Sequence, residues 1–128
     1  PYAYDKALTW SDRPETFVKR AGFVLMATLA VHDKKATDDF IAAFLPIIER
    51  EAADERNFVK KAVNWALRQI GKRNLPLNVL AIETAHRIQQ GDSKAARWIA
   101  TDALRELTSE STQYRLRTPI SERRKKKT

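Results

Sequence analysis

The sequence contains no cysteine, three glycines, five prolines and no long apolar run. The absence of cysteine excludes a disulfide framework and a thiolate zinc site, and it is typical of a reducing compartment, so we expect a cytoplasmic protein. The longest apolar run, residues 21–31, contains Thr28. It is shorter than the roughly 20 residues that a membrane-spanning helix needs, so we expect no membrane partner.

The scarcity of glycine and proline leaves few turn signals, and no stretch alternates apolar and polar residues as a half-buried strand does. We therefore predict an all-α fold. The expected helices cover residues 3–10, 14–32, 37–52, 54–74, 76–91 and a last stretch that is capped by Asp92 or Ser93 and reaches residue 107. Pro46 should kink or divide the third helix, and the polar chain beyond Thr108 is expected to fray.

Two short motifs recur along the chain. The sequence Phe-Val-Lys-Arg-Ala at 17–21 returns as Phe-Val-Lys-Lys-Ala at 58–62, and Ala-Leu-Arg-Gln-Ile at 66–70 returns as Ala-Leu-Arg-Glu-Leu at 103–107. A repeat of about 40 residues with two helices per unit predicts a HEAT-like α-solenoid, in which equivalent residues of successive units line up along one surface. We expect Arg20 to lie beside Lys61 in this way.

The stretch 54–74 is the most strongly amphipathic part of the sequence. Asp54 is placed to cap its start, and Gly71 is placed to end it in a left-handed conformation. The apolar side is expected to run through Phe58, Val59, Ala62, Val63, Ala66 and Ile70. At 100° per residue, a separate arc of about 100° carries Lys61, Asn64, Trp65 and Arg68.

Two interpretations of that arc remain open from the sequence. Trp65 can be a rim residue packed on the next helix, with solvated cations around it, which is the commoner situation for such residues. Alternatively, the indole of Trp65 stacks on a base or sugar while Lys61 and Arg68 hold phosphates.

Positive charge is concentrated at the end of the chain. The net charge is +8, but residues from 113 onward carry seven Lys or Arg against one Glu, whereas residues 1–112 carry 17 basic and 15 acidic residues. We predict a single helical domain over residues 1–112, followed by a basic disordered tail at 113–128. The tail is expected to add a weak attraction to phosphates that depends on salt and not on nucleotide sequence.

Three stretches resemble the bacterial DNA alkylation repair enzymes, the AlkD-type HEAT-like glycosylases. They are residues 17–30 (FVKRAGFVLMATLA), 57–74 (NFVKKAVNWALRQIGKRN) and 95–107 (AARWIATDALREL), and the resemblance extends over about residues 1–107. It implies that the protein or its parent hydrolyses the N-glycosidic bond of N3- or N7-alkylated purines on a concave surface that binds double-stranded DNA.

The resemblance also implies residue roles. Arg20 matches a family arginine near the DNA backbone, and Trp65 matches a family tryptophan that faces the damaged nucleotide. The DNA-contacting set that we predict is Lys19, Arg20, Lys61, Asn64, Trp65, Arg68 and Arg105. An alkylated purine is already cationic and a good leaving group, so aromatic faces and one carboxylate can suffice for the chemistry.

The chain departs from the family pattern in one respect. The catalytic aspartate of the family lies upstream of the region that matches residue 1, and neither Asp12 nor Asp102 takes its place. We therefore expect the chain to be the C-terminal half of a longer protein, to lack excision activity by itself, and to self-associate through its N-terminal end. We predict no cofactor and no metal, since His32 and His86 have no ligand-spaced partners.

Two other function classes stay open at this point. One is a HEAT-like nucleic-acid-binding module without catalysis, and the other is a solenoid that binds proteins.

Overall fold

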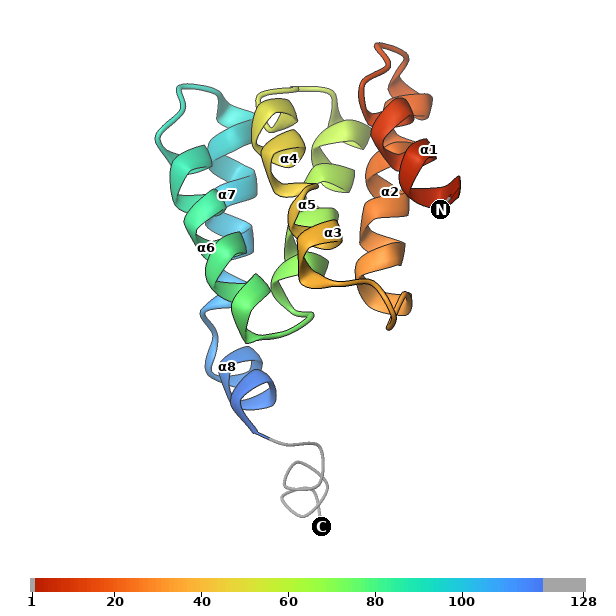
Figure 1. The fold of residues 1–128 in the computed structure, drawn as a ribbon. Coiled ribbons are helices and arrows are strands. Elements are labelled where there is room, and N and C mark those ends of the chain that lie inside the picture. The colour runs from red at the N-terminus through yellow and green to blue at the C-terminus, as the bar shows by residue number, and fades with distance from the viewer. Residues whose placement is uncertain (1, 119–128) are drawn as a thin grey trace.

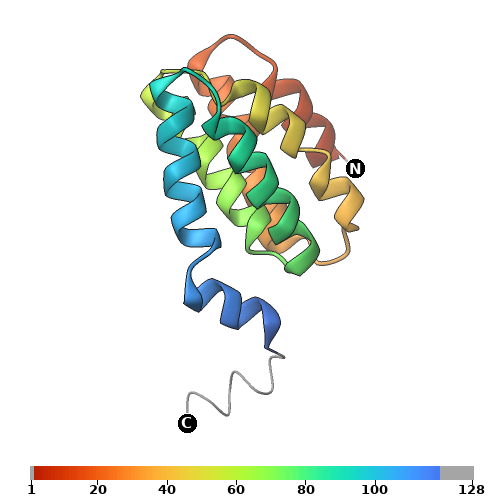
Figure 2. The ribbon, with the colours of Figure 1, turned by 90° about the vertical axis from the view of Figure 1, so that its left-hand side faces the viewer.

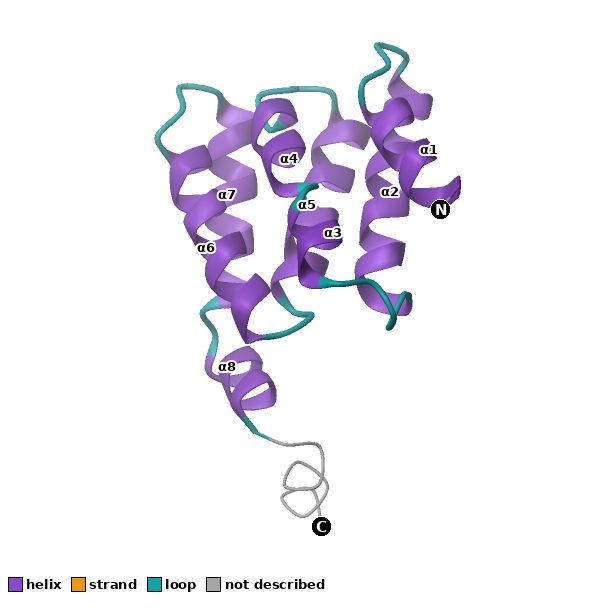
Figure 3. Ribbon diagram, in the orientation of Figure 1, coloured by secondary structure: helices purple, strands orange, loops and turns teal. Residues whose placement is uncertain are grey.

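The computed structural model describes residues 2–118, and in that part of the chain the secondary structure is helical, without strands (Figure 3). The helices are α1 (Tyr2–Ser11), α2 (Thr16–His32), α3 (Asp38–Ala42), α4 (Leu45–Glu51), α5 (Asn57–Gly71), α6 (Leu75–Gln89), α7 (Lys94–Leu107) and α8 (Glu110–Arg117). The predicted all-α fold is confirmed. No described helix combines the length and the apolar character needed to cross a bilayer.

The helices pack in consecutive pairs that form two layers (Figures 1 and 2). One layer contains α1, the broken helix α3–α4, and α6. The other contains α2, α5 and α7, and each of these packs against a neighbour in its own layer as well as a partner in the opposite one. This arrangement of stacked helix pairs is that of a helical-repeat solenoid.

The core lies between the two layers. Its largest fully buried side chains include Phe23 and Met26 from α2, Phe44 before α4, and Ile99 and Leu107 from α7. The apolar side of α5 faces this core through Val59, Val63, Ala66, Leu67 and Ile70. Phe58, which the sequence pattern placed on the same side, is instead half exposed at the edge.

Pro46 divides the third predicted helix into α3 and α4. It stands in the first turn of α4, where the missing N–H of proline costs nothing. Of the two caps considered for α7, the structure uses Ser93, whose hydroxyl oxygen accepts a hydrogen bond from the N–H of Ala96 at 3.2 Å.

Both predicted caps of α5 are wrong. The helix begins at Asn57 after Arg56, and the carboxylate of Asp54 instead accepts hydrogen bonds from the N–H and guanidinium of Arg56. No described glycine has a positive φ, and Gly71 is the last residue of the helix itself. A Cβ at Gly71 would lie 2.5 Å from a methyl carbon of Leu107, so a larger residue at this position would force the Leu107 side chain of α7 to shift.

Helix α8 contradicts the expectation that the chain frays beyond Thr108. Its N-cap is Ser109, and Gln113 donates hydrogen bonds to the carbonyl of Leu107 at 2.7 Å and to Oδ1 of Asn78 at 3.1 Å. The predicted tail boundary at residue 112 falls inside this helix. The rest of the predicted tail, residues 119–128, lies outside the described residues.

Candidate nucleic-acid interface

The outward surface of the layer formed by α2, α5 and α7 brings together most of the predicted contact residues. We call it the α2–α5–α7 face. Its exposed or partly exposed aromatic and basic side chains are Phe17, Arg20, Phe58, Lys61, Trp65, Arg68, Trp98 and Arg105. The opposite sides of the three helices pack against α1, α4 and α6, so these side chains share one surface.

The seam between α2 and α5 is held by an aromatic pair. The ring centroids of Phe17 and Phe58 lie 5.6 Å apart with the planes tilted by 43°. These two residues are the first positions of the repeated motif, so the 41-residue repeat corresponds to a real register between the two helices. Arg20 and Lys61 follow at equivalent positions, and both are exposed.

Neither Arg20 nor Lys61 is neutralised locally. Within the described residues, no carboxylate oxygen lies within 4 Å of either side-chain nitrogen, although ten ion pairs are found elsewhere. Both charges are therefore available to an anionic partner.

Trp65 lies one turn after Lys61 on the same side of α5, and 38% of the residue is exposed. Trp65 is therefore partly accessible at the surface and is not enclosed in the core. An indole of this kind offers an apolar face at the surface between cations, which suits stacking on a base.

The seam between α5 and α7 is built differently. The Arg68 guanidinium donates to Oε1 of Glu106 at 2.9 Å and lies 3.8 Å from a carboxylate oxygen of Asp102. Lys72 donates to the other oxygen of Glu106 at 3.1 Å. Arg105 donates to Asp102 at 3.4 Å, so Arg68 and Arg105 both lie close to the same carboxylate.

These contacts change the acidity of Glu106. Burial by itself raises the pKa of the Glu106 carboxyl, but hydrogen bonds from Arg68 and Lys72, together with their charges, bring the pKa below its ordinary value. The carboxylate is thus stabilised in its charged form. The cations of this seam are correspondingly engaged inside the protein.

Two predicted contact residues do not reach the face. Lys19 is only 6% exposed, and its Nζ donates to Oε1 of Glu51 at 2.5 Å because α2 turns this position toward α4. Asn64 is 2% exposed; it donates to the carbonyl of Ile99 and accepts from Nε of Arg68 at 2.8 Å. Asn64 therefore orients Arg68 rather than presenting itself to a ligand.

Sequence reasoning missed the partners of Arg68. Asp102 and Glu106 are four residues apart on one helix, so their shared side of α7 was readable from the sequence. Trp98 was also missed as a surface aromatic; the ammonium of Lys60 lies 5.0 Å from the centroid of its ring. In residues 2–118, no three potential metal ligands gather at one place.

Comparison with known proteins identifies a family for this chain. No curated protein and no solved structure matched this chain. A family model described as "DNA alkylation repair enzyme" matches residues 1–107, a range that includes helices α1 to α7. The chain therefore belongs to the DNA alkylation repair enzyme family.

Proposed function

We propose that the chain supplies part of the DNA-binding surface of a glycosylase-like protein that removes N3- or N7-alkylated purines from double-stranded DNA. The observation that carries the proposal is the α2–α5 seam, where Arg20, Lys61 and Trp65 are exposed on adjacent helices and the two cations have no carboxylate partner among the described residues. Family membership supports a role in DNA alkylation repair.

The exposed residues of the α2–α5 seam have different roles in DNA binding, according to their chemistry. Arg20 and Lys61 bind backbone phosphates, which fixes the position of the duplex without reading its sequence. Trp65 faces the damaged nucleotide, and its π-system favours a cationic alkylated base over a neutral one. A purine that already carries a positive charge needs no strong general acid to leave, so binding and electrostatic stabilisation supply much of the catalysis.

Fluorescence anisotropy with two duplexes, one undamaged and one carrying a single N7-methylguanine, tests the proposal. Lys61→Ala should weaken binding to both duplexes about equally, by roughly tenfold, and should lower the salt dependence by about one released ion. Trp65→Ala should instead remove the preference for the damaged duplex. Arg87→Ala on α6, in the opposite layer, is the charge-matched control and should bind like the parent.

If the parent chain and the Lys61 and Trp65 variants bind both duplexes equally well, the α2–α5–α7 face is not the DNA-binding surface. The same outcome would favour the protein-binding class of solenoid.

A second candidate function is DNA binding without excision, and the α5–α7 seam favours it for this chain in isolation. Asp102 and Glu106 both point toward Arg68 and are engaged in ion pairs. A carboxylate held in this way is poorly placed to stabilise an oxocarbenium-like sugar. We therefore propose that excision requires a carboxylate other than these two. Release of methylated purine by residues 1–128, measured by chromatography, would contradict binding without excision. Loss of that release in Asp102→Asn or Glu106→Gln would contradict the need for another carboxylate.

We also propose self-association through the α1–α2 end. Tyr2, Leu8 and Phe17 are exposed there, and Trp10, Phe17, Val18 and Ala21 line an apolar depression. Light scattering over a range of concentrations should show a dimer that Leu8→Lys weakens.

The cytoplasmic location stays a prediction from the sequence.

A further inference from the structure

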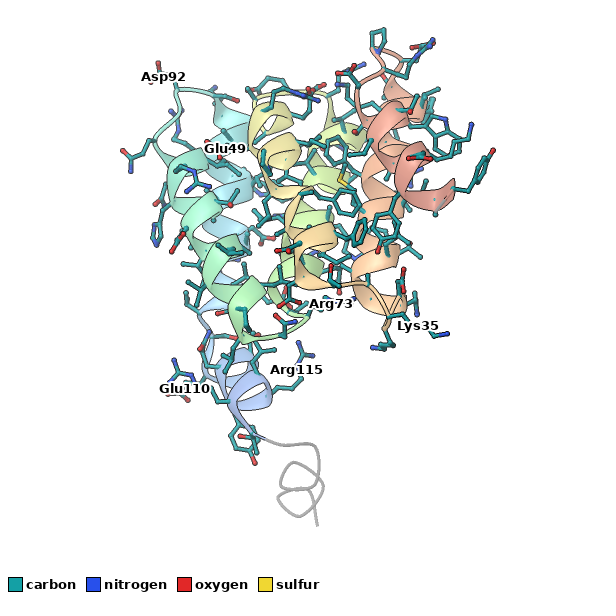
Figure 4. All side chains as sticks on the ribbon, viewed as in Figure 1. Lys35, Glu49, Arg73, Asp92, Glu110 and Arg115 are labelled. Atoms are coloured by element: carbon teal, nitrogen blue, oxygen red, sulfur yellow. The ribbon has the colours of Figure 1, made fainter. Side chains whose placement is uncertain are left out.

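A second group of cations lies at the other end of the α2–α5–α7 face, where α2 and α5 end and α8 begins. A pocket of about 240 Å³ is lined there by Lys34, Lys72, Arg73 and Arg115, together with Ala30, Val31 and Gln69. Among residues 2–118, no acidic residue lines this pocket. Figure 4 shows Arg73 and Arg115 near one another at this end of the molecule.

One side of the pocket is held in place by the hydrogen bonds of Arg73. The Arg73 guanidinium donates to four backbone carbonyls around the end of α2, those of Leu29, Ala30, Asp33 and Ala36, at distances of 2.8–3.5 Å. Its cation therefore ties the start of the α5–α6 connection to the end of α2. Such a guanidinium adds positive charge to the pocket floor without being free to move.

The other side of the pocket depends on α8. Gln113 links α8 to Asn78 of α6 and to the carbonyl of Leu107, and Thr112 of α8 is buried. Arg115 lies two residues beyond Gln113 and one turn beyond Ser111 and Thr112. Its position over the pocket is thus set by hydrogen bonds made within the folded domain.

Lys34 and Arg115 are the available donors. Within residues 2–118, neither side chain has a carboxylate oxygen within 4 Å, and Lys72 shares its ammonium with Glu106 only. Two long cations from separate parts of the chain, in the same pocket as a fixed guanidinium, match a ligand that carries several negatively charged oxygen atoms. A phosphate group is such a ligand, and a guanidinium binds it with paired N–H donors.

The pocket is in line with the proposed DNA contacts. Lys72 is seven residues after Trp65, two turns along the same side of α5, which is about 10 Å along the helix axis. Successive phosphates of one DNA strand advance about 3.4 Å along the duplex. For a duplex that runs along α5, the pocket lies within reach of a phosphate about three nucleotides from the one nearest Trp65.

We infer that this pocket, formed by Lys34, Lys72, Arg73 and Arg115, binds a backbone phosphate of the DNA strand and that α8 extends the interface beyond the part of the chain that matches the family. The choice of DNA as the source of the phosphate rests on the proposed function. The pocket itself recognises the phosphate group, whether from DNA or free in solution.

The test uses two pairs of matched variants in the full chain. Arg115→Ala is compared with Arg117→Ala, which removes the same charge from the same helix but does not line the pocket. Lys34→Ala is compared with its neighbour Lys35→Ala, which lies outside this pocket. Duplex affinity is measured by anisotropy across a salt series, and inorganic phosphate is titrated while backbone amide signals are followed by NMR.

Arg115→Ala should weaken duplex binding about tenfold and Lys34→Ala about fivefold, each lowering the salt slope by about one, whereas the controls should change affinity less than twofold. Arg115→Lys should restore part of the affinity. Circular dichroism establishes that the variants are folded.

Each outcome separates the pocket from the proposed function. Equal losses in Arg115→Ala and Arg117→Ala would show a general charge effect and overturn the pocket. Duplex binding that depends on Lys61 and Trp65 but not on Arg115 or Lys34 would overturn the pocket and leave the proposed function standing. If duplexes do not bind but phosphate shifts the pocket amides, and Arg115→Ala abolishes the shift, the proposed function fails and a free-phosphate site remains. No response to either ligand overturns both.

Discussion

The two seams of the α2–α5–α7 face carry similar numbers of basic residues but use them in opposite ways. At the α2–α5 seam an aromatic pair joins the helices, and Arg20 and Lys61 stand without carboxylate partners in the described part of the chain. At the α5–α7 seam Arg68, Lys72 and Arg105 are engaged by Asp102 and Glu106. Because apolar contact joins the α2–α5 seam, its cations stay free to bind a polyanion. At the α5–α7 seam the cations form ion pairs within the protein and stabilise the fold.

The largest expected effect is on DNA affinity at the α2–α5 seam. The double variant Arg20→Ala/Lys61→Ala should lose about 100-fold in duplex affinity, since two charge-assisted phosphate contacts of about 1.4 kcal/mol each are removed. Its unfolding midpoint should stay close to that of the parent, because neither side chain is paired inside the protein. Anisotropy and urea denaturation measure the two quantities on the same samples.

A comparable loss of stability in that double variant would break the distinction between the seams. It would mean that the two cations support the fold after all.

Arg68→Ala should have the converse effect at the α5–α7 seam. It leaves Glu106, Asp102 and Asn64 without their shared donor in a half-buried site, so we expect a loss of about 2 kcal/mol in the free energy of unfolding. Arg105→Ala is the matched control; the Arg105 side chain is 74% exposed, and its pair with Asp102 should contribute less than about 0.5 kcal/mol. Equal stability of the two variants would show that Arg68 is free to bind phosphate as Lys61 is.

Acid should weaken the α5–α7 seam selectively. The pKa of Glu106 is lowered in the folded protein from its ordinary value of 4.5, so the unfolded chain binds a proton more readily. The stability from Glu106 is therefore fully present above about pH 4.5 and is lost as the pH falls through the lower folded pKa. Unfolding measured from pH 7 to pH 3 should show a smaller acid-induced loss in Glu106→Gln than in the parent. A profile unchanged by this variant would place the acid sensitivity at other carboxyl groups; the pKa values of Glu15, Glu51, Asp54 and Glu55 are also lowered.

The smallest expected effect concerns the aromatic pair. A double-mutant cycle of Phe17→Ala and Phe58→Ala should give a coupling of about 0.5–1 kcal/mol, the usual size for a tilted ring pair at this separation. The measurement is urea denaturation of the four proteins. No coupling at all would mean that the register of α2 against α5 is set by the buried core alone.

Local reasoning from the sequence predicted most helices but not their ends. The repeated motifs and the amphipathic pattern located α2, α5 and α7, and the position of Pro46 accounted for the break between α3 and α4. The capping roles of Asp54 and Gly71 were wrong because contacts with Arg56 and Leu107 decide those positions. Helix α8 was missed, although Ser109 before a polar helical stretch is a typical N-cap signal.

The site was predicted in part. Arg20, Lys61 and Trp65 are exposed on neighbouring helices, as the repeat and the family resemblance implied, and their contact with DNA stays a prediction. Lys19 could not be separated from Arg20 by sequence, because adjacent residues on a helix differ by about 100° and only the tertiary structure shows that Lys19 is buried and paired with Glu51. The pocket at Arg115 depends on residues more than 40 positions apart, and no local pattern indicates it.

The sequence by itself determined the helical class, the 41-residue register between α2 and α5, and membership in a DNA alkylation repair family. These properties follow from periodicity and local motifs. Only the tertiary structure decided which cations remain free. Arg20 and Arg68 are the same residue type on similar helices, but Arg68 meets Asp102 and Glu106, 34 and 38 residues away in sequence, and Arg20 meets no acid in the described chain. Whether a cation is free depends on its distance in space from carboxylates, because Coulomb attraction weakens with distance and salt screens it beyond about 10 Å.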